Sequence, residues 1–562
     1  MTTGAEALVR GLAAAGVTEA FGIAGGKMTP LLQALAADGR LRWTGVRHEA
    51  SAAIMAAGHA ALTGQVAVAL GEMGPGALNL LAGAGVAAGN HWPALLLTTN
   101  QHRRAAYPHR GMFMDLDTHA LMAPLVKWSA VVNDPARLPE LLHTALRHAL
   151  SGVPGPVHLD LPHDVLTADT GLADAAMDAP PAQWMARGRP RPDAATVAAM
   201  AQALQEARRP LIVAGGGVVA SGASDALRAL ATRLNAPVLP TQMALGVVDS
   251  SGPQAIGHGG LIAGPAALAA LREADVVLSV GCRWSSWLWD EHGPRVPPGA
   301  ALLAINLDPL ALGEPAPHAL AAQADALAAL DDLLAALPVV TATDPDWLPG
   351  LRQRRADDWA ARTLDPVDDE TGIHPGALAR RLGDLMPAHA LAVFDGGHTS
   401  FWSNEATPAT APRTRFHDPG MCQLGFGLPF ALALQRARPG TPVWHLTGDG
   451  SFGFTLNELD TARREGLPVL TVVHHNAAWG VIRAGQQRAG FALGTDLAGT
   501  DYAAIARGFG CHGEVITRLD GLDAALARAQ ASGLPAVIDC RTRWVPHPCM
   551  PDFGAMNRFG SV

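Results

Sequence analysis

The chain has 562 residues, of which 49% are hydrophobic and 16% are charged, so it is too long for one core and predicts about three domains. Its net charge of −9, with no run of Lys or Arg, argues against nucleic-acid binding, which needs concentrated positive charge. No apolar stretch is long enough to span a membrane and the N-terminus lacks a basic-then-apolar signal, so we expect a cytoplasmic protein. Five scattered cysteines without C-x-x-C spacing predict reduced thiols and no zinc site.

Residues 1–166 alternate helix-like and strand-like segments, which predicts a parallel α/β domain. The expected helices include 4–15 and 50–62, and the expected strands are 20–23, 43–46, 66–70, 94–98 and 156–161. Gly26 and Glu72 lie close after the first and third of these strands. Since parallel strands end at the same edge of a sheet, we expect these residues at one edge.

A linker rich in Ala, Pro and Asp over 167–191 separates this domain from a second α/β domain over 192–338. The expected strands of the second domain lie at 210–214, 237–239, 274–278 and 302–308. Three glycines at 215–217 follow the first of them, as in nucleotide sites, but they lack the full dinucleotide spacing. We interpret them as a tight strand-to-helix turn.

A link that carries an Arg-rich helix leads to a third α/β domain over 373–545. Its expected strands are 390–394, 443–446, 469–473 and 536–539. The last residues, 546–562, have little periodicity and are either a tail over the active site or a neighbouring surface, or a disordered end. The expected fold class is therefore α/β, with three doubly wound parallel-sheet domains.

The stretch 446–480 carries the strongest functional signal. Gly448-Asp449-Gly450-Ser451 follows one apolar strand and Asn476 follows the next, so the Asp and Asn side chains are expected at adjacent strand ends. Exposed N–H groups at a helix start favour a phosphate. Mg²⁺ that keeps water and phosphate ligands needs only one carboxylate, one amide oxygen and a carbonyl. The pattern predicts a Mg²⁺-diphosphate site, although Gly-Asp-Gly alone is also common in turns.

This motif resembles that of the thiamine diphosphate-dependent decarboxylase, lyase and acetolactate synthase superfamily, which includes benzoylformate decarboxylase and benzaldehyde lyase. The resemblance implies that the side chains of Asp449 and Asn476 and the carbonyl of Ala478 hold Mg²⁺. The family has Asn at the position of His475, so the ligand is kept and its neighbour differs. The resemblance also implies cofactor contacts from Gly448, Gly450, Ser451, Trp479, Gly480 and Val481.

By the same resemblance, the first domain is pyrimidine-binding, the second is central and the third binds the diphosphate. The cofactor's own aminopyrimidine removes the thiazolium C2 proton once its distal ring nitrogen is hydrogen-bonded to a carboxyl group. Arg47-His48-Glu49-Ala50 matches the family's strand–Glu–helix pattern, so this role falls to Glu49, with Asn79 as a further cofactor contact. In the family these two domains meet between subunits, which implies a homodimer or homotetramer with active sites at subunit interfaces.

Two further stretches of the third domain resemble the family's cofactor contacts. Gly397, His398 and Thr399 follow a strand and are expected at the diphosphate or the pyrimidine. Leu424 precedes Gly-Phe-Gly, where the family has an apolar wedge that bends the cofactor. Cys422 stands where a Gly carbonyl usually meets the exocyclic amine, so we expect its carbonyl to act there and its thiol to be a small packed group.

Three neighbourhoods are expected to line the reactive carbon and to supply catalytic residues beside Glu49. They contain Gly26, Glu72, and the pair Phe113-Met114 on the loop after the fourth strand. The bulky apolar residues there favour a hydrophobic or aromatic acyl group, with ordinary core packing as the alternative. Further candidates for proton transfer or substrate binding are Lys27, His102, His109, His398 and His475.

The expected function is that of a thiamine diphosphate- and Mg²⁺-dependent lyase or carboligase acting on 2-oxo acids or 2-hydroxy ketones through a C2 ylid and an enamine. Acetolactate synthases and benzaldehyde lyase carry a Gln where this chain has Phe113-Met114. An acetolactate synthase-like transferase with a structural FAD is therefore the alternative, and residues 281–284 only partly resemble the flavin-contacting stretch. A non-catalytic cofactor-binding relative is the third possibility.

Overall fold

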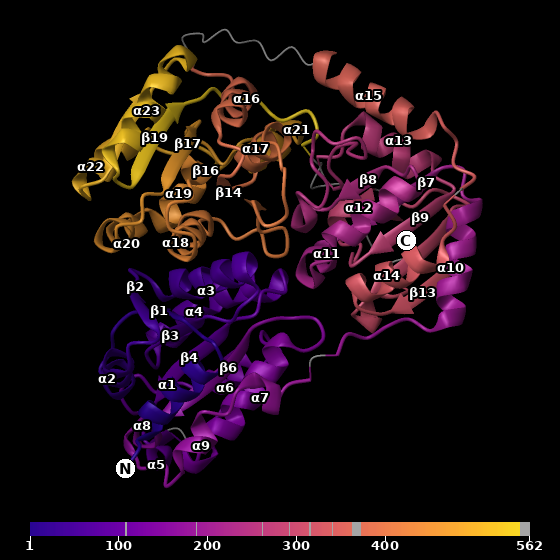
Figure 1. The fold of residues 1–562 in the computed structure, drawn as a ribbon. Helices are drawn as coiled ribbons and strands as arrows, with labels where there is room; N and C mark the ends of the chain where they lie inside the picture. Colours follow the sequence, from indigo (N-terminus) through magenta and orange to yellow (C-terminus); the bar gives the residue numbers. More distant parts are fainter. Residues whose placement is uncertain are drawn as a thin grey trace.

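The computed structural model of the protein describes residues 1–106, 110–186, 188–260, 262–290, 293–313, 316–339, 341–361 and 372–550. Three parallel sheets follow one another along the chain, each covered by helices (Figure 1). Within these described ranges, no helix is long and apolar enough to cross a membrane. The fold class is α/β with three doubly wound domains, as predicted.

The first sheet has the strand order β2-β1-β3-β4-β6-β5, and all of its neighbouring strands are parallel. Its strands are β1 Glu19–Gly22, β2 Arg42–Gly45, β3 Val68–Gly71, β4 Leu95–Asn100, β5 Ser129–Val131 and β6 Val157–Pro162. Its helices are α1 Gly4–Ala14, α2 Thr29–Asp38, α3 Glu49–Thr63, α4 Pro75–Gly89, α5 Arg103–Ala106, α6 Thr118–Met122, α7 Leu138–Leu150 and α8 His163–Thr167.

The second sheet has the order β13-β12-β9-β7-β8. Its strands are β7 Pro210–Ala214, β8 Val238–Pro240, β9 Val276–Val280, β12 Ala301–Asn306 and β13 Leu320–Gln323, beside a small antiparallel pair, β10 Trp289–Asp290 and β11 Gly293–Pro294. Its helices are α10 Ala194–Glu206, α11 Gly216–Ser221, α12 Ser224–Arg233, α13 Pro265–Glu273 and α14 Ala326–Ala336. The preceding connection contains α9 Asp174–Met177, and the following one contains α15 Trp347–Ala361.

The third sheet, β15-β14-β16-β17-β19-β18, repeats the strand order of the first. Its strands are β14 Leu391–Phe394, β15 Arg415–Phe416, β16 Val443–Gly448, β17 Leu470–His475, β18 His512–Ile516 and β19 Ala536–Arg541. Its helices are α16 Pro375–Leu385, α17 His398–Ala406, α18 Gly427–Ala437, α19 Asp449–Thr455, α20 Leu459–Glu465, α21 Gly480–Arg488, α22 Tyr502–Gly508 and α23 Leu522–Ser532. Short 3₁₀ turns lie at Pro135–Arg137, Pro181–Gln183, Gln242–Ala244, Ser286–Leu288, Pro309–Ala311, Leu456–Glu458 and Leu519–Gly521.

The winding direction of the three sheets reverses at β1/β3, β7/β9 and β14/β16. Loops that leave neighbouring strands at such a point diverge to opposite faces and leave a crevice at the carboxyl edge, which is where open α/β sheets bind ligands. The residues that follow these strands include Gly26 and Glu72 in the first sheet, 215–217 in the second, and Gly397 and Asp449 in the third. The topology thus defines three candidate ligand positions.

The strands that the sequence analysis missed are edge strands. β5, β13, β15 and β18 each end their sheet, and β5 and β18 are largely half-buried or exposed. Their residues, such as Leu-Ala-Ala-Gln in β13 and Arg-Phe in β15, contain no continuous β-branched run. Pairing with a buried neighbour, and not local pattern, makes them strands.

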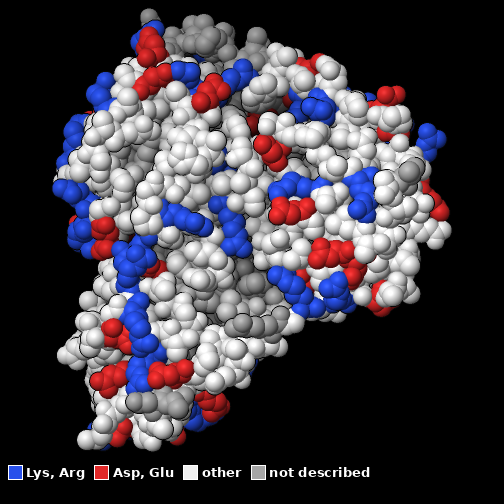
Figure 2. Space-filling model, in the orientation of Figure 1, with Lys and Arg blue, Asp and Glu red and all other residues white. Residues whose placement is uncertain are grey.

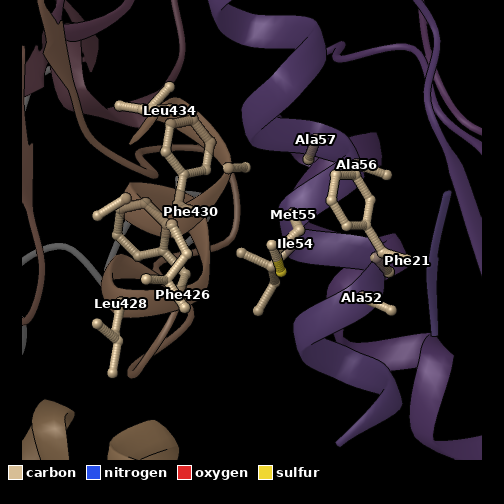
Figure 3. Packing of buried hydrophobic residues seen from close by; sticks show 14 of the residues in the cluster. Phe21, Ala52, Ile54, Met55, Ala56, Ala57, Phe426, Leu428, Phe430 and Leu434 are labelled. Atoms are coloured by element: carbon tan, nitrogen blue, oxygen red, sulfur yellow. The ribbon is translucent and has the colours of Figure 1, made fainter. Parts of the chain in front are cut away.

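The first and third domains share one hydrophobic core (Figure 3). Ile54 and Met55 of α3 lie toward Phe426, Leu428 and Phe430 around the start of α18, whereas Ala52 and Ala56 lie on the side of Phe21. The approach is close, since a β-carbon at Gly58 would lie 3.2 Å from Phe430. Small residues on α3 therefore let the two helices pack directly.

Charges are mixed on the surface. On the face in Figure 2, Lys and Arg lie interspersed with Asp and Glu. At the junction of the first and third domains, Arg436 pairs with both Glu19 (2.9 Å) and Glu465 (3.0 Å). The Glu19 carboxylate is almost fully buried and also pairs with Arg42, so two guanidinium groups compensate its buried charge.

We predict that Phe430→Ala destabilises the joint core. The Phe430 ring is fully buried and lies 5.1 Å from the Trp92 ring, so truncation leaves a cavity that costs about 3–5 kcal/mol. Urea unfolding followed by tryptophan fluorescence measures the loss. Leu310→Ala, at a side chain that is 83% exposed, is the control, and equal midpoints for the two variants would contradict the prediction.

Candidate active site

Asp449 and Asn476 lie at the carboxyl ends of the adjacent parallel strands β16 and β17. The strand register pairs Gly448 with His474, so the two side chains follow that pair by one and two positions. Asp449 is buried, and its Oδ1 accepts the Gly450 N–H at 2.9 Å. The Oδ1 of Asn476 accepts the Ala478 N–H at 3.0 Å. Each oxygen keeps a lone pair for a further ligand.

The second carboxylate oxygen of Asp449 is the clearest chemical signal in this domain. Asp449 Oδ2 is buried and has no hydrogen-bond partner among the residues that the structure describes, and burial raises the pKa of this carboxyl group. An unpartnered buried carboxylate is costly unless a cation compensates it. In the described part of the chain, no three His, Cys, Asp or Glu side chains are placed to share a metal. One carboxylate, one amide oxygen and a carbonyl suit Mg²⁺, which takes its remaining ligands from water and phosphate.

The turn after β17 is held open by backbone contacts. Ala477 adopts a left-handed conformation with φ of +51°, its carbonyl accepts the Leu497 N–H, and the Trp479 N–H donates to the Thr495 carbonyl. A β-carbon at Gly450 would lie 2.5 Å from the Trp479 ring. Glycine at 450 therefore lets the indole lie over the start of α19, with Gly480 and Val481 following in α21.

The loop after β14 forms the other side of this crevice. A β-carbon at Gly448 would lie 3.1 Å from Thr399 Oγ1, and one at Gly396 would lie 2.8 Å from Ser451 Oγ. A β-carbon at Gly397 would lie 2.5 Å from a methyl group of Val481. These close approaches bring the predicted residues 397–399, 448–451 and 481 together. Their backbone N–H groups and hydroxyls suit a diphosphate.

Asp395 is a structural residue of this site that the sequence analysis did not single out. Its buried carboxylate accepts the N–H groups of Gly425 (3.2 Å) and Gly427 (3.1 Å). These bonds fix the loop that carries Leu424, which is half-buried, and Cys422, which is exposed with φ of +53°. The Cys422 conformation explains why glycine is usual there. An Asp directly after a strand was the only sequence signal for this role.

The ring of His398 faces the C-terminal segment. Its Nε2 lies 2.5 Å from the Val545 carbonyl, and burial lowers the pKa of the imidazole to about 4. The next residues also pack on the third domain, since Trp544 Nε1 donates to the Gly480 carbonyl and His547 contacts Glu405. Of the predicted tail, residues 546–550 thus lie near α17, and 551–562 fall outside the described residues.

Glu49 begins α3 at the carboxyl edge of the first sheet. It is 8% exposed, and its Oε2 accepts the Asn79 Nδ2–H at 2.9 Å. Gly76 leaves room for the other oxygen, because a β-carbon there would lie 3.1 Å from Glu49 Oε1. The structure therefore brings Glu49 and Asn79 together, with one carboxylate oxygen held and the other beside a glycine.

Glu72 lies next to Glu49 but points to the loop after β1. Its carboxylate accepts the Lys27 N–H at 3.1–3.2 Å and the Thr99 hydroxyl at 3.2 Å. Gly25 lies so close to the carboxylate that any side chain there would collide with it. Around Gly26 the space is open. Glu72 thus fixes the loop that carries Gly26.

The loop after β4 contributes apolar side chains. Met114 has a left-handed φ of +60° and packs against Gly74. Gly74 follows Glu72 by two residues in the sequence. Phe113 is 82% exposed, and its carbonyl accepts a hydrogen bond from Gln101. The ring centroids of His102 and His163 lie 5.5 Å apart. His109 falls outside the described residues.

A separate cavity of about 690 Å³ lies where the three domains meet. It is lined by the glycine turn 215–217, by 281–283, and by residues of the first and third domains that include His91 and Arg413. Arg283 donates to the Gly89 carbonyl across its wall. The turn at 215–217 is tight, as predicted, because Gly215 and Gly217 touch Gly281, and it also lines a cavity of cofactor size.

Comparison with protein families gives three matches in chain order. Residues 2–121 match the N-terminal TPP-binding domain of thiamine pyrophosphate enzymes, 197–333 match their central domain, and 395–540 match their C-terminal TPP-binding domain. These spans contain Glu49 at the carboxyl edge of the first sheet, the glycine turn at 215–217, and Asp449 at the carboxyl edge of the third sheet.

Curated relatives match over nearly the whole chain. A probable acetolactate synthase large subunit from Methanocaldococcus jannaschii is 30% identical over 95% of this chain and 91% of its own length. The acetolactate synthase isozyme 2 large subunit of Escherichia coli is 31% identical over 93% and 92%. A probable 2-ketoarginine decarboxylase from Pseudomonas aeruginosa is 32% identical over 91% and 88%.

We predict that Asp449→Asn separates stability from ligand binding. The substitution removes a buried charge without a partner, so the ligand-free variant should melt at or above the wild-type temperature. The rise in melting temperature caused by Mg²⁺ with thiamine diphosphate should disappear, because ligand-induced stabilisation follows affinity. Asp520→Asn, at an exposed carboxylate, should keep that rise. A full ligand-induced rise in Asp449→Asn would refute the assignment.

Proposed function

This chain belongs to the thiamine pyrophosphate enzymes, and from that premise we propose that it is a lyase or carboligase that uses thiamine diphosphate and Mg²⁺ to break or form the bond next to a carbonyl carbon. The observation that carries the proposal is the unpartnered, buried Oδ2 of Asp449 beside the Asn476 amide. A protein that only used this fold as a scaffold would gain stability by replacing that carboxylate. This argues for a bound cation, which the non-catalytic cofactor-binding alternative would need as well.

The third domain supplies the anchor for the cofactor. In the proposal, Asp449, Asn476 and the Ala478 carbonyl hold Mg²⁺, and the N–H groups and hydroxyls of 397–399 and 448–451 hold the diphosphate. Leu424 and the Cys422 carbonyl contact the organic part. When bound, the cofactor supplies a carbon nucleophile and an electron sink for the substrate carbonyl.

The first domain supplies the proton-handling carboxylate. Glu49 is buried and, within the described ranges, has a single side-chain donor, Asn79, so its second oxygen can meet a ring nitrogen. The hydrogen bond from Asn79 fixes the orientation of the carboxylate. Glu72 is engaged by Lys27 and Thr99, so we assign it the positioning of the 25–27 loop beside the substrate.

The substrate pocket favours an apolar acyl group, as in 2-oxo acid decarboxylation or carboligation. Met73 is buried, and the pair Phe113-Met114 stands where the resemblance places a Gln in acetolactate synthases and benzaldehyde lyase. Methionine adapts its shape and offers no hydrogen-bond donor to a second polar substrate. A decarboxylase among the relatives supports this assignment.

The second candidate function is an acetolactate synthase-like transferase that carries FAD. The 690 Å³ cavity of the central domain favours it, because the cavity lies at the switch point β7/β9 and is lined by glycines that allow close approach of a ligand. A yellow colour that stays with the purified protein would favour this candidate, and colourless active protein would exclude a bound oxidised flavin.

We propose a homodimer or homotetramer with active sites between subunits. Apolar side chains are exposed near the carboxyl edges of both the first and third sheets, which is typical of a surface that a partner covers. They are Met112, Phe113, Phe454, Ile482, Phe491 and Leu493.

The substrate class is tested by incubating the Mg²⁺- and cofactor-loaded protein with pyruvate, benzoylformate, longer aliphatic 2-oxo acids and benzoin. Carbon dioxide, aldehyde and acetolactate are measured in parallel. Aldehyde from apolar 2-oxo acids supports the first proposal, and acetolactate from pyruvate supports the second. If the protein binds the cofactor but turns over none of these compounds, the result would support the non-catalytic alternative.

We predict that Glu49→Gln lowers turnover about 10²–10⁴-fold, the usual contribution of a positioned acid or base. The amide keeps the shape of the side chain and an oxygen for Asn79, so the dissociation constant of thiamine diphosphate should change much less. Steady-state kinetics and calorimetry on the same preparation measure the two effects. A variant with more than about a tenth of wild-type turnover would exclude the role.

We predict that two inactive variants restore each other when mixed. If Glu49 of one subunit serves Asp449 of another, a mixed dimer of Glu49→Gln and Asp449→Asn has one site in which both residues are native. Activity should then appear after the two proteins are dissociated and reassociated together. Each variant treated alone is the control, and a mixture that stays inactive although native mass spectrometry shows mixed dimers would place the site within one chain.

A further inference from the structure

His475 occupies the last position of β17, where its ring is buried between two carboxylates. Its Nδ1 lies 2.9 Å from Asp539 Oδ1, and its Nε2 lies 3.8 Å from Asp449 Oδ2. The same Nε2 is 3.2 Å from the guanidinium of Arg541. This is the position at which the sequence departs from the Asn of its family.

The two hydrogen-bond partners define how the ring is used. The Asp539 carboxylate accepts, so Nδ1 carries the proton that lies between them. Arg541 can only donate, so Nε2 accepts. The ring therefore has no N–H left for Asp449, although its Nε2 lies 3.8 Å from Oδ2. This explains how a buried carboxylate oxygen stays without a protein donor.

The remaining contacts close a ring of interactions around this group. Asp539 Oδ2 accepts the Tyr502 N–H at 3.2 Å and pairs with Arg541 at 3.0 Å. The Tyr502 hydroxyl donates to the Asp449 carbonyl at 3.0 Å, and its ring packs edge-on against the His475 ring. Both the backbone and the side-chain surroundings of Asp449 are thus fixed by one cluster, made of His475, Tyr502, Asp539 and Arg541.

Within this cluster and Asp449 together, one negative charge, that of the Asp449 carboxylate, has no compensating positive charge. Arg541 faces Asp539 at 3.0 Å, so these two charges offset each other, and the His475 ring stands between that pair and Asp449. The carboxylate of Asp449 then presents its charge toward the crevice, where the compensating group must be a cation. Outer groups that orient a metal-binding side chain change metal affinity about 10- to 100-fold when they are removed.

We propose that His475 is a positioning residue, which, with Asp539 and Arg541, withholds a hydrogen bond from Asp449 Oδ2 and so reserves that oxygen for the divalent cation. The inference rests on the proposed function, because it presumes that Asp449 is a metal ligand. It goes further in assigning the metal affinity to a residue that does not touch the metal.

The test measures binding of Mn²⁺, used in place of Mg²⁺, to the protein with thiamine diphosphate, by the loss of the free-ion signal in electron paramagnetic resonance. His475→Phe keeps a ring but removes both nitrogens, so Arg541 loses its acceptor on the ring. Its N–H groups are then free to donate to Asp449 Oδ2 in competition with the cation, which should weaken Mn²⁺ binding at least about 10-fold. His475→Asn places an amide nitrogen near the position of Nδ1, keeps the bond to Asp539, and should stay within about threefold of the wild type.

The matched control is His474→Phe, on the same strand. The His474 ring is buried and neither of its nitrogens has a hydrogen-bond partner among the described residues, so Phe there should leave Mn²⁺ affinity unchanged. If His475→Phe does not fold, Arg541→Met at the partly exposed end of the cluster takes its place, with the same expected direction.

Each outcome decides a different statement. Wild-type affinity in His475→Phe, equal losses in the 474 and 475 variants, or failure of His475→Asn to restore binding would each overturn the positioning role. Wild-type protein that binds no Mn²⁺ in the presence of thiamine diphosphate would overturn the proposed function itself. Weak binding in His475→Phe, together with near-normal binding in His475→Asn and His474→Phe, supports the inference.

Discussion

Parallel strands cannot be joined by tight hairpins, and this constraint organises the whole molecule. Every connection must cross back to the opposite edge, so all the loops that follow strands gather at one edge of each sheet. Where the winding reverses, two such loops separate and leave a crevice. Glu49 and Glu72 lie around the first of these edges, and Asp449 lies at the crevice of the third.

The residues around these crevices lower the folding stability of an otherwise well-packed protein. Asp449 keeps an unpartnered oxygen, Glu49 has one donor, and Ala477 and Met114 hold left-handed backbone conformations. Such features reduce stability and persist only where the surroundings over-determine them. Here the surroundings are the shared core of α3 and α18 and the buried strands beneath the loops. The molecule combines rigid sheets with edges that are suited to a charged ligand.

Much of this arrangement could be predicted from local pattern. Apolar runs located the central strands, and the spacing from Asp449 to Asn476 placed both residues at adjacent strand ends, where the structure has them. The edge strands were missed because pairing creates them. The direction of the His398 ring, the role of Asp395 and the cluster around His475 depend on contacts between segments distant in sequence. No local pattern contains those contacts.

The joint core of α3 and α18 has a consequence for biosynthesis. The apolar face of α3 belongs to the first part of the chain to leave the ribosome, whereas the phenylalanines that cover it are made only after the central domain has been translated. During synthesis, the apolar face of α3 therefore stays exposed to solvent until the third domain is made. Such exposed apolar surface promotes aggregation. Chaperones that bind the exposed apolar face of α3 would protect the chain until the third domain is made.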